Sequence, residues 1–169
     1  MPDSSASDLP IKVQQVMACL AASGVDSRLH MSTTAAKTAV LAAEVLGVSV
    51  GQIANSLIFQ DEVSGELVLI VASGAHRVDL ALIHEQTGRR LVKAAGKDIK
   101  AKVGYAIGGV PPVAHLSALV TFLDEALLQY ETVWAAAGVA ESMCSLPPKS
   151  LPLLTQGRWV RVAEPATTR

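Results

Sequence analysis

Glu66-Leu-Val-Leu-Ile-Val71 is the stretch that decides the fold class. Its five consecutive apolar residues do not alternate with polar ones, which is typical of a strand buried on both faces of a sheet. The preceding Gln52-Ile-Ala-Asn-Ser-Leu-Ile-Phe59 predicts a neighbouring strand, and Asp61-Glu-Val-Ser-Gly65 between them has the composition of a hairpin turn. A β-hairpin is therefore expected, with its second strand central in the sheet.

Segments with helical spacing of apolar residues lie around this hairpin. Each follows a capping residue and stops at a glycine, as amphipathic helices do. The predicted helices cover residues 11–21, with Ser7 and Asp8 as candidate caps and Ser23-Gly24 as the end; residues 39–46, from Thr38 to Gly47; and residues 80–87, from Asp79 to Gly88.

Short apolar segments separated by turns fill much of the remaining chain. Further strands are predicted over residues 25–30, 116–123, 132–138, 142–146 and 158–162, and short helical turns over 125–129 and 151–154. Strands joined by short turns and mixed with helices indicate an α/β domain. We expect one domain over residues 8–163, between a disordered start (1–7) and a tail (164–169).

The composition bounds the possible partners. Fourteen Lys and Arg against fifteen Asp and Glu give a formal charge of −1, and only 4% of the residues are aromatic. Such a chain has no electrostatic reason to coat nucleic acid, so specific binding to duplex DNA is not expected. No apolar signal segment opens the chain, and its longest apolar run, residues 67–72, is too short to cross a bilayer, which predicts a cytoplasmic protein without membrane contact.

The sequence has no pattern typical of a metal or cofactor site. Its four histidines show no ligand spacing among themselves or with Cys19 and Cys144, which are far apart and are expected to be reduced thiols. A serine hydrolase would have a GxSxG motif, and Ser73-Gly74 lacks the leading glycine. We therefore expect no metal, no cofactor and no side-chain nucleophile.

Gly104-Tyr-Ala-Ile-Gly-Gly-Val-Pro-Pro-Val-Ala-His115 is a candidate ligand loop. Gly108 and Gly109 permit positive φ angles and close approach of another molecule, while Pro111 and Pro112 fix the exit of the loop. The amides of Gly108, Gly109 and Val110 remain available, so a preorganised set of backbone donors is one interpretation. A tight connection between two elements is the other.

Two further stretches have features of ligand sites. Ala72-Ser-Gly-Ala-His-Arg-Val-Asp79 joins the end of a buried strand to the start of a helix, where ligand loops are common. The only concentration of basic residues comprises Arg89, Arg90, Lys93, Lys97, Lys100 and Lys102. Steering of a phosphate-bearing ligand and an ordinary solvated face are both consistent with these residues.

Several motifs follow one another in a consistent order from about Thr38 to Val162. They are Thr38-Ala39…Ala42-Ala43…Leu46-Gly47, Ile53-Ala-Asn-Ser-Leu-Ile-Phe59, the 72–79 stretch, the 104–115 loop and Val133-Trp-Ala-Ala-Ala-Gly138. Together they resemble the YbaK/EbsC family, which is related to the editing domain inserted in bacterial prolyl-tRNA synthetases. The resemblance implies a central mixed, mainly antiparallel sheet flanked by helices, and hydrolysis of mischarged aminoacyl-tRNA in trans, as a second sieve after a synthetase.

The resemblance also implies residue roles. The amides of Gly108 and Gly109 would stabilise the developing oxyanion, while the ribose hydroxyl of the tRNA and a water would move the protons. The contacts to the substrate would come from Ser73, Gly74, His76, Arg77, Val110 and Pro111. Steering of the acceptor end, our own inference, would fall to Arg89, Arg90, Lys93 and Lys97. An aminoacyl-tRNA synthetase is a further candidate partner.

Asn55 departs from the family pattern Ile-x-Lys-Ser/Thr-Leu, whose lysine is expected to meet the negatively charged end of the tRNA. Loss of such a charge-assisted contact forfeits about 1–3 kcal/mol of binding or transition-state stabilisation. Lys37 is a candidate replacement, and His76 stands where an Asn is common in the family. A catalytically silent tRNA-binding module is therefore the alternative to a working deacylase that uses Asn55.

Overall fold

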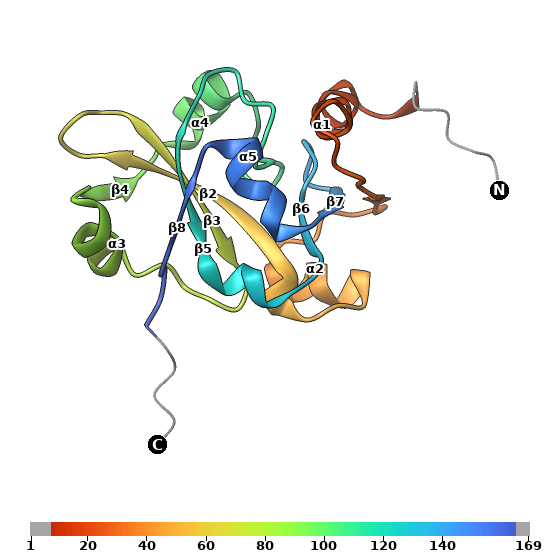
Figure 1. Ribbon diagram of the computed structural model, residues 1–169. Helices are drawn as coiled ribbons and strands as arrows, with labels where there is room; N and C mark the ends of the chain where they lie inside the picture. The colour runs from red at the N-terminus through yellow and green to blue at the C-terminus, as the bar shows by residue number, and fades with distance from the viewer. Residues whose placement is uncertain (1–7, 165–169) are drawn as a thin grey trace.

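A central eight-stranded mixed sheet organises the computed structural model, which describes residues 8–164 (Figure 1). The expected disordered start and residues 165–169 of the expected tail lie outside the described residues. The strand order is β1-β7-β6-β2-β3-β5-β8, with β4 also paired to β2. The strands are β1 (Leu29–Met31), β2 (Ile53–Asp61), β3 (Leu67–Ser73), β4 (Leu91–Lys93), β5 (Val120–Asp124), β6 (Val133–Ala136), β7 (Ser142–Leu146) and β8 (Arg158–Val160).

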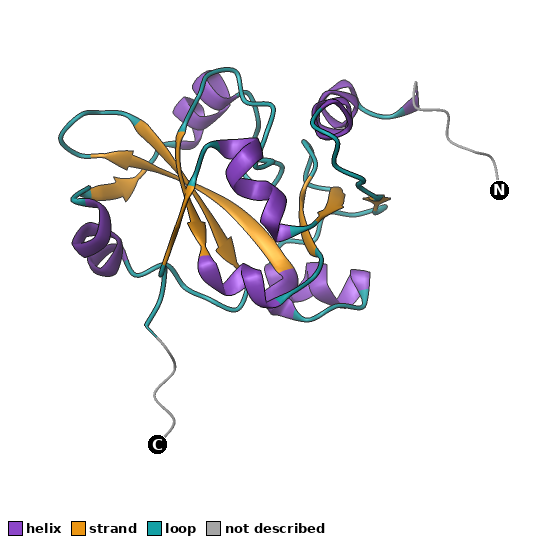
Figure 2. Ribbon diagram, in the orientation of Figure 1, coloured by secondary structure: helices purple, strands orange, loops and turns teal. Residues whose placement is uncertain are grey.

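Helices pack on both faces of this sheet (Figure 2). They are α1 (Ile11–Ala22), α2 (Ala39–Leu46), α3 (Leu80–Thr87), α4 (Gly96–Val103) and α5 (Leu151–Thr155), with 3₁₀ turns η2 (Val50–Gln52), η3 (Glu125–Gln129) and η4 (Pro148–Ser150). Four strand pairings are antiparallel, and three are parallel. The expected mixed, mainly antiparallel sheet with flanking helices is confirmed.

The β2–β3 hairpin is the centre of the sheet, as the sequence predicts. Its strands pair antiparallel from Ala54↔Ser73 to Gln60↔Leu67, and every residue of β3 is buried. Because side chains alternate along a strand, Leu69 and Val71 join the cluster formed with α1, α4 and α5, while Ile70 joins the cluster on the opposite face with α3. This two-sided burial explains the unbroken apolar run.

The helix caps follow the predicted residues. The Oγ1 of Thr38 accepts a hydrogen bond from the N–H of Leu41 at 3.1 Å, and α2 ends at Gly47, whose φ of 69° is left-handed. The Oδ1 of Asp79 likewise accepts from two amides at the start of α3, which ends at Gly88. These local contacts set the ends of α2 and α3. Helix α2 packs on the sheet beside the start of β2.

One predicted helix cap and two predicted strand boundaries differ from the structure. Helix α1 begins at Ile11 after Pro10 without a side-chain cap, and the candidate cap Ser7 lies outside the described residues. The expected strand over 25–30 is reduced to Leu29–Met31, because the N–H of Val25 closes α1 by donating to Leu20 O. The expected strand over 116–123 starts only at Val120, because residues 116–117 instead hydrogen-bond the carbonyls at the end of α4.

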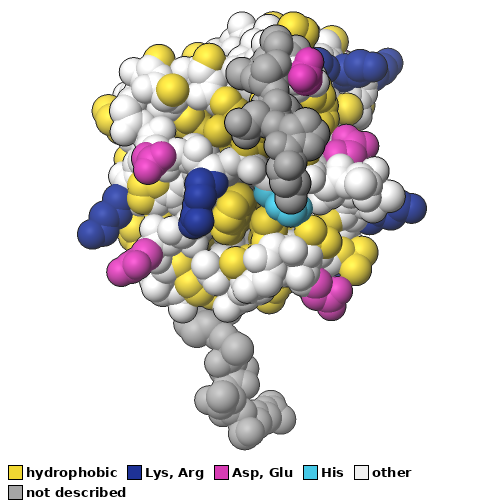
Figure 3. Space-filling view, turned by 90° about the vertical axis from the view of Figure 1, so that its right-hand side faces the viewer, with side chains coloured by type: hydrophobic (Ala, Val, Ile, Leu, Met, Phe, Trp, Pro, Cys, Tyr) yellow, Lys and Arg dark blue, Asp and Glu magenta, His cyan; other side chains and the backbone are white. Residues whose placement is uncertain are grey.

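The surface in Figure 3 mixes charges of both signs with neutral and apolar side chains. On this face the described residues form no continuous basic stripe of the kind that binds a nucleic-acid backbone. Among residues 8–164, none of the helices combines the length and the apolar character needed to span a bilayer.

Candidate active site

A cavity of about 310 Å³ opens where β2 and β6 separate. These strands pair only at Ile53↔Trp134 and Ala54↔Ala135, and β4 joins the same edge of β2 from Phe59 onward. The edge of β2 over residues 55–58 therefore pairs with no strand of the described chain. Helix α2, the loop before it and the 104–115 loop contribute the other walls.

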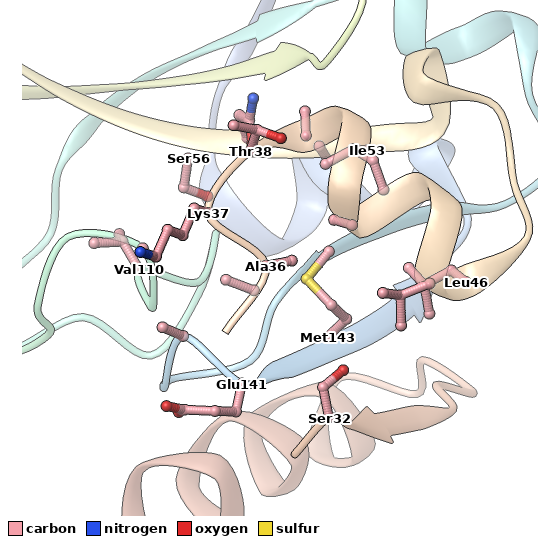
Figure 4. A pocket seen from close by; sticks show the side chains of 18 of the residues that line it. Ser32, Ala36, Lys37, Thr38, Leu46, Ile53, Ser56, Val110, Glu141 and Met143 are labelled. Carbon is pink, nitrogen blue, oxygen red and sulfur yellow. The ribbon is translucent and has the colours of Figure 1, made fainter. Parts of the chain in front are cut away.

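The lining of the cavity divides into a charged end and an apolar end (Figure 4). Lys37 extends towards Val110, and Glu141 lies on the same side of the cavity, whereas Met143 and Leu46 lie on the other. The polar side chains in the lining are His30, Ser32, Lys37, Thr38, Asn55, Ser56 and Glu141. Such a cavity can hold a ligand that has a small apolar group at one end and charged or polar groups at the other.

Two residues of the 104–115 loop line this cavity and have free backbone N–H groups, but they are not the pair expected from the sequence. Gly108 is exposed in the lining with a φ of 93°, and Val110 also lines the cavity. Neither of their N–H groups donates to an acceptor within residues 8–164. The N–H of Gly109 instead donates to Ala106 O at 3.0 Å, so Gly109 cannot be the second oxyanion donor.

Gly109 has a packing role. It is buried outside the cavity lining, and a Cβ at this position would lie only 2.8 Å from the Cα of Val139. The glycine thus lets the loop pack directly against the backbone between β6 and β7. Pro111, two residues further along the chain, is also buried and absent from the lining, contrary to its expected substrate contact.

Two side chains hold the exit of the loop, and the sequence did not assign them this role. The hydroxyl of Tyr105 donates to Ala114 O at 2.8 Å, and the Nε2 of His115 hydrogen-bonds Pro111 O at 2.7 Å. Because a carbonyl oxygen only accepts, Nε2 must hold a proton. Burial lowers the pKa of His115, although the bond to Pro111 raises it, so the neutral imidazole is favoured.

Asn55 and Lys37 line the same cavity from different segments. Asn55 lies on β2, and Lys37 precedes the cap of α2; neither side chain has a hydrogen-bond or ion-pair partner among residues 8–164. The lining therefore includes Lys37, whose ammonium group is free, while Asn55 occupies the position on β2 where the family has its lysine. Lys37 and Asn55 share one cavity, which a replacement of the family lysine by Lys37 requires.

The predicted residues of the 72–79 stretch do not reach the cavity. Ser73 is buried, its N–H donates to the Oδ2 of Asp124 at 2.9 Å, and its hydroxyl donates to Gly51 O at 2.9 Å. The Nδ1 of His76 lies 2.9 Å from the same Asp124 oxygen. A Cβ on Gly74 would be 2.8 Å from the Cβ of Ala39, and Arg77 is exposed. Ser73, Gly74, His76 and Arg77 are all absent from the lining.

The predicted steering residues also lie outside the cavity lining: Arg89, Arg90, Lys93 and Lys97. The guanidinium of Arg89 pairs with Asp61 at 3.0 Å and with Glu66 at 3.5 Å, so it braces the β2–β3 hairpin. Backbone N–H groups of the turn lower the pKa of the Asp61 carboxyl, and Arg89 lowers it further. The structure thus gives Arg89 a contact within the hairpin, and its steering role stays a prediction.

The described residues offer little alternative chemistry. Residues 8–164 contain no group of three His, Cys, Asp or Glu side chains that could hold a metal ion. Burial raises the pKa of the Cys144 thiol to about 12, so this thiol stays protonated at neutral pH. The reactive features of the cavity are its free amides, Lys37, Asn55 and Glu141.

Comparisons with known proteins give a consistent result. A family model described as the aminoacyl-tRNA editing domain matches residues 33–152. The uncharacterized protein YwhH of Bacillus subtilis is 33% identical over 118 residues, 70% of this chain and 74% of YwhH. EbsC of Enterococcus faecalis, named as a proposed Cys-tRNA(Pro)/Cys-tRNA(Cys) deacylase, is 28% identical over 121 residues, 71% of this chain and 73% of EbsC. A crystal structure described as a proposed trans-editing enzyme for prolyl-tRNA synthetase matches with a TM-score of 0.84 at 34% identity, covering 93% of this chain and 99% of that chain.

Proposed function

Because the chain belongs to the aminoacyl-tRNA editing domain family, we propose that it hydrolyses the ester of mischarged aminoacyl-tRNA in trans. The family match and the similarity to EbsC confirm the resemblance to the YbaK/EbsC family. The observation that supports the site is the cavity itself, which combines free backbone donors, a free lysine and a small apolar end.

In the proposed reaction, the aminoacyl group enters the cavity with its side chain at the apolar end. Water attacks the ester carbonyl carbon, and negative charge develops on the carbonyl oxygen. The N–H groups of Gly108 and Val110 stabilise this oxyanion, because preorganised donors act most strongly where charge develops. The carbonyl then re-forms as the bond to the ribose oxygen breaks, the ribose oxygen takes the proton that the attacking water gives up, and the free amino acid leaves.

Lys37 takes the role of the family lysine in this proposal. Its ammonium group meets the negatively charged end of the tRNA, while Asn55 donates a hydrogen bond from the wall of the cavity. A catalytically silent module is not favoured, because the relatives include a proposed deacylase and a proposed trans-editing enzyme. Lys37 also supplies a free lysine to the cavity, so the presence of Asn55 in place of the family lysine does not by itself imply lost activity.

Several finer assignments belong to the same proposal. The partner is the acceptor end of a mischarged tRNA, and an aminoacyl-tRNA synthetase is the protein partner that this substrate suggests, with the reaction in the cytoplasm. No specific contact with duplex DNA is involved. One editing domain spans residues 8–163, and Arg90, Lys93 and Lys97 guide the tRNA from outside the cavity.

Release of amino acid from a panel of mischarged tRNAs tests the proposed function. We expect the purified protein to deacylate at least one member of the panel with a small side chain at a rate well above the spontaneous rate, and to leave correctly charged tRNA with a large side chain intact. Absence of turnover on every member, with tRNA binding retained, would contradict the enzyme assignment.

A further inference from the structure

We propose that Glu141 binds the α-ammonium group of the aminoacyl ester and makes a free amine a requirement for hydrolysis. This inference rests on the proposed function. Glu141 is the only acidic side chain in the lining of the cavity. It was not among the residues singled out from the sequence, because no local motif marks it.

The position of Glu141 relative to the donor loop supports this role. Its neighbour Ala140 lies against Gly108, since a Cβ built on Gly108 would be 3.6 Å from the Cβ of Ala140. The carbonyl oxygen of Glu141 accepts the N–H of Ser32 at 2.8 Å, which fixes the backbone at this point. The carboxylate is therefore presented from a fixed backbone next to the amides proposed to bind the ester oxygen.

The charge of Glu141 is available to a ligand. Its carboxylate has no hydrogen-bond or ion-pair partner among residues 8–164, and Lys37 lies too far away to pair with it. Both charged side chains lie at the same side of the cavity (Figure 4). One cationic and one anionic side chain, held apart in the lining of one cavity, match a ligand that has both an anion and a cation.

An aminoacyl-tRNA end is such a ligand. Its phosphates are anionic, and its α-ammonium is attached to the carbon next to the ester carbonyl. With the carbonyl oxygen at Gly108, the ammonium would lie beside Glu141 and the phosphates beside Lys37. An N-acylated ester has no cation at this position and would leave the carboxylate without a partner, which disfavours that ligand.

The test compares the panel tRNA that the wild-type protein hydrolyses fastest with the N-acetyl derivative of the same aminoacyl-tRNA. We expect the wild-type protein to prefer the free amine by about tenfold or more in kcat/KM. Glu141→Gln should lower kcat/KM for the free amine by about ten- to a hundredfold and leave the acetylated substrate nearly unchanged. Glu44→Gln is the matched control, because Glu44 is an exposed acid on α2 outside the cavity lining, and it should retain the preference.

Equal hydrolysis of the two substrates by the wild-type protein would overturn the role of Glu141 and leave the deacylase assignment intact. The role of Glu141 would also be overturned if Glu141→Gln lowered kcat/KM equally for both substrates. The same holds if Glu44→Gln lowered kcat/KM for the free amine as much as Glu141→Gln does. Turnover of no panel member would instead remove the proposed function, and the role of Glu141 with it. Thermal melting of both variants shows whether a loss of kcat/KM comes from a folding defect.

Discussion

In the 104–115 loop, the N–H groups of Gly108 and Val110 have no acceptor within residues 8–164, whereas in the 72–79 corner the N–H and the hydroxyl of Ser73 both donate to acceptors inside the fold. Both segments are short, contain glycine and follow a regular element. A buried polar group is normally satisfied by the protein itself, so the donors left free are those available to a ligand. The candidate site therefore differs from the scaffold in whether its polar groups already have hydrogen-bond partners within the protein, more than in its residue types.

Asp124 is the reason for this difference. Its buried carboxylate accepts from the N–H groups of Ser73 and Ala126 and contacts the Nδ1 of His76. Within residues 8–164, no carboxylate accepts a hydrogen bond from the N–H of Gly108. Substitutions in the 104–115 loop should therefore alter catalysis, whereas substitutions in the 72–79 corner should alter folding.

Gly108→Ala should have the largest effect on activity. The left-handed φ of 93° costs a residue with a Cβ about 1–2 kcal/mol, and the resulting shift misplaces a backbone donor. Loss of one oxyanion donor lowers kcat by about 100-fold or more. Steady-state deacylation with circular dichroism melting measures both effects.

Gly65→Ala is the control for Gly108→Ala. Gly65 has a φ of 77° in the hairpin turn with nothing within 4 Å of the added Cβ, so it has similar strain without proximity to the cavity. We expect a similar loss of stability and an unchanged kcat. An equal loss of kcat in the two variants would indicate that Gly108 matters only for folding.

Asp124→Ala should affect stability and spare chemistry. Removal of the carboxylate leaves the Ser73 N–H without its acceptor inside the fold and should lower the free energy of unfolding by about 2–4 kcal/mol. For the fraction that remains folded, kcat should stay within about twofold of the wild-type value. Urea unfolding and active-site-normalised kinetics separate the two quantities. A large fall in kcat with unchanged stability would indicate that the 72–79 corner takes part in catalysis.

The pH dependence of the loop is the smallest expected effect. The pKa of His115 is lowered by burial, so its neutral form is favoured in the fold. The stability contributed by this group is present above the unfolded-state pKa near 6.5 and is lost as the pH falls through the lower folded-state value. An NMR titration of the His115 imidazole should give a midpoint below 6.5. A midpoint at or above 6.5 would show that the Pro111 contact, and not burial, dominates.

The sequence predicts those parts of the fold that depend on near neighbours. Thr38, Asp79 and the glycines after α2 and α3 mark helix ends through bonds within a few residues, and the unbroken run in β3 reports burial on both faces. The strand over 116–123 was overestimated because the carbonyls of α4 compete for residues 116–117. That competition depends on the tertiary position of α4, which no local pattern encodes.

The candidate site was predictable to the extent that motifs mark it. Asn55, Lys37, Gly108 and Val110 were singled out and lie around one cavity. Gly109 was misassigned because its amide closes a tight turn on Ala106, and Ser73 because its acceptor lies 51 positions away. No local pattern marks Glu141, since a single acid before a strand is common on any surface.

The most direct test of the account is the kcat/KM for deacylation of the preferred panel tRNA by Lys37→Gln, alone and combined with Asn55→Lys. If Lys37 has replaced the family lysine, we expect Lys37→Gln to lose about ten- to a hundredfold and the added Asn55→Lys to restore most of it. Lys149→Gln, at an exposed lysine outside the cavity lining, should retain full activity. Full activity in Lys37→Gln would contradict the placement of the tRNA end in this cavity.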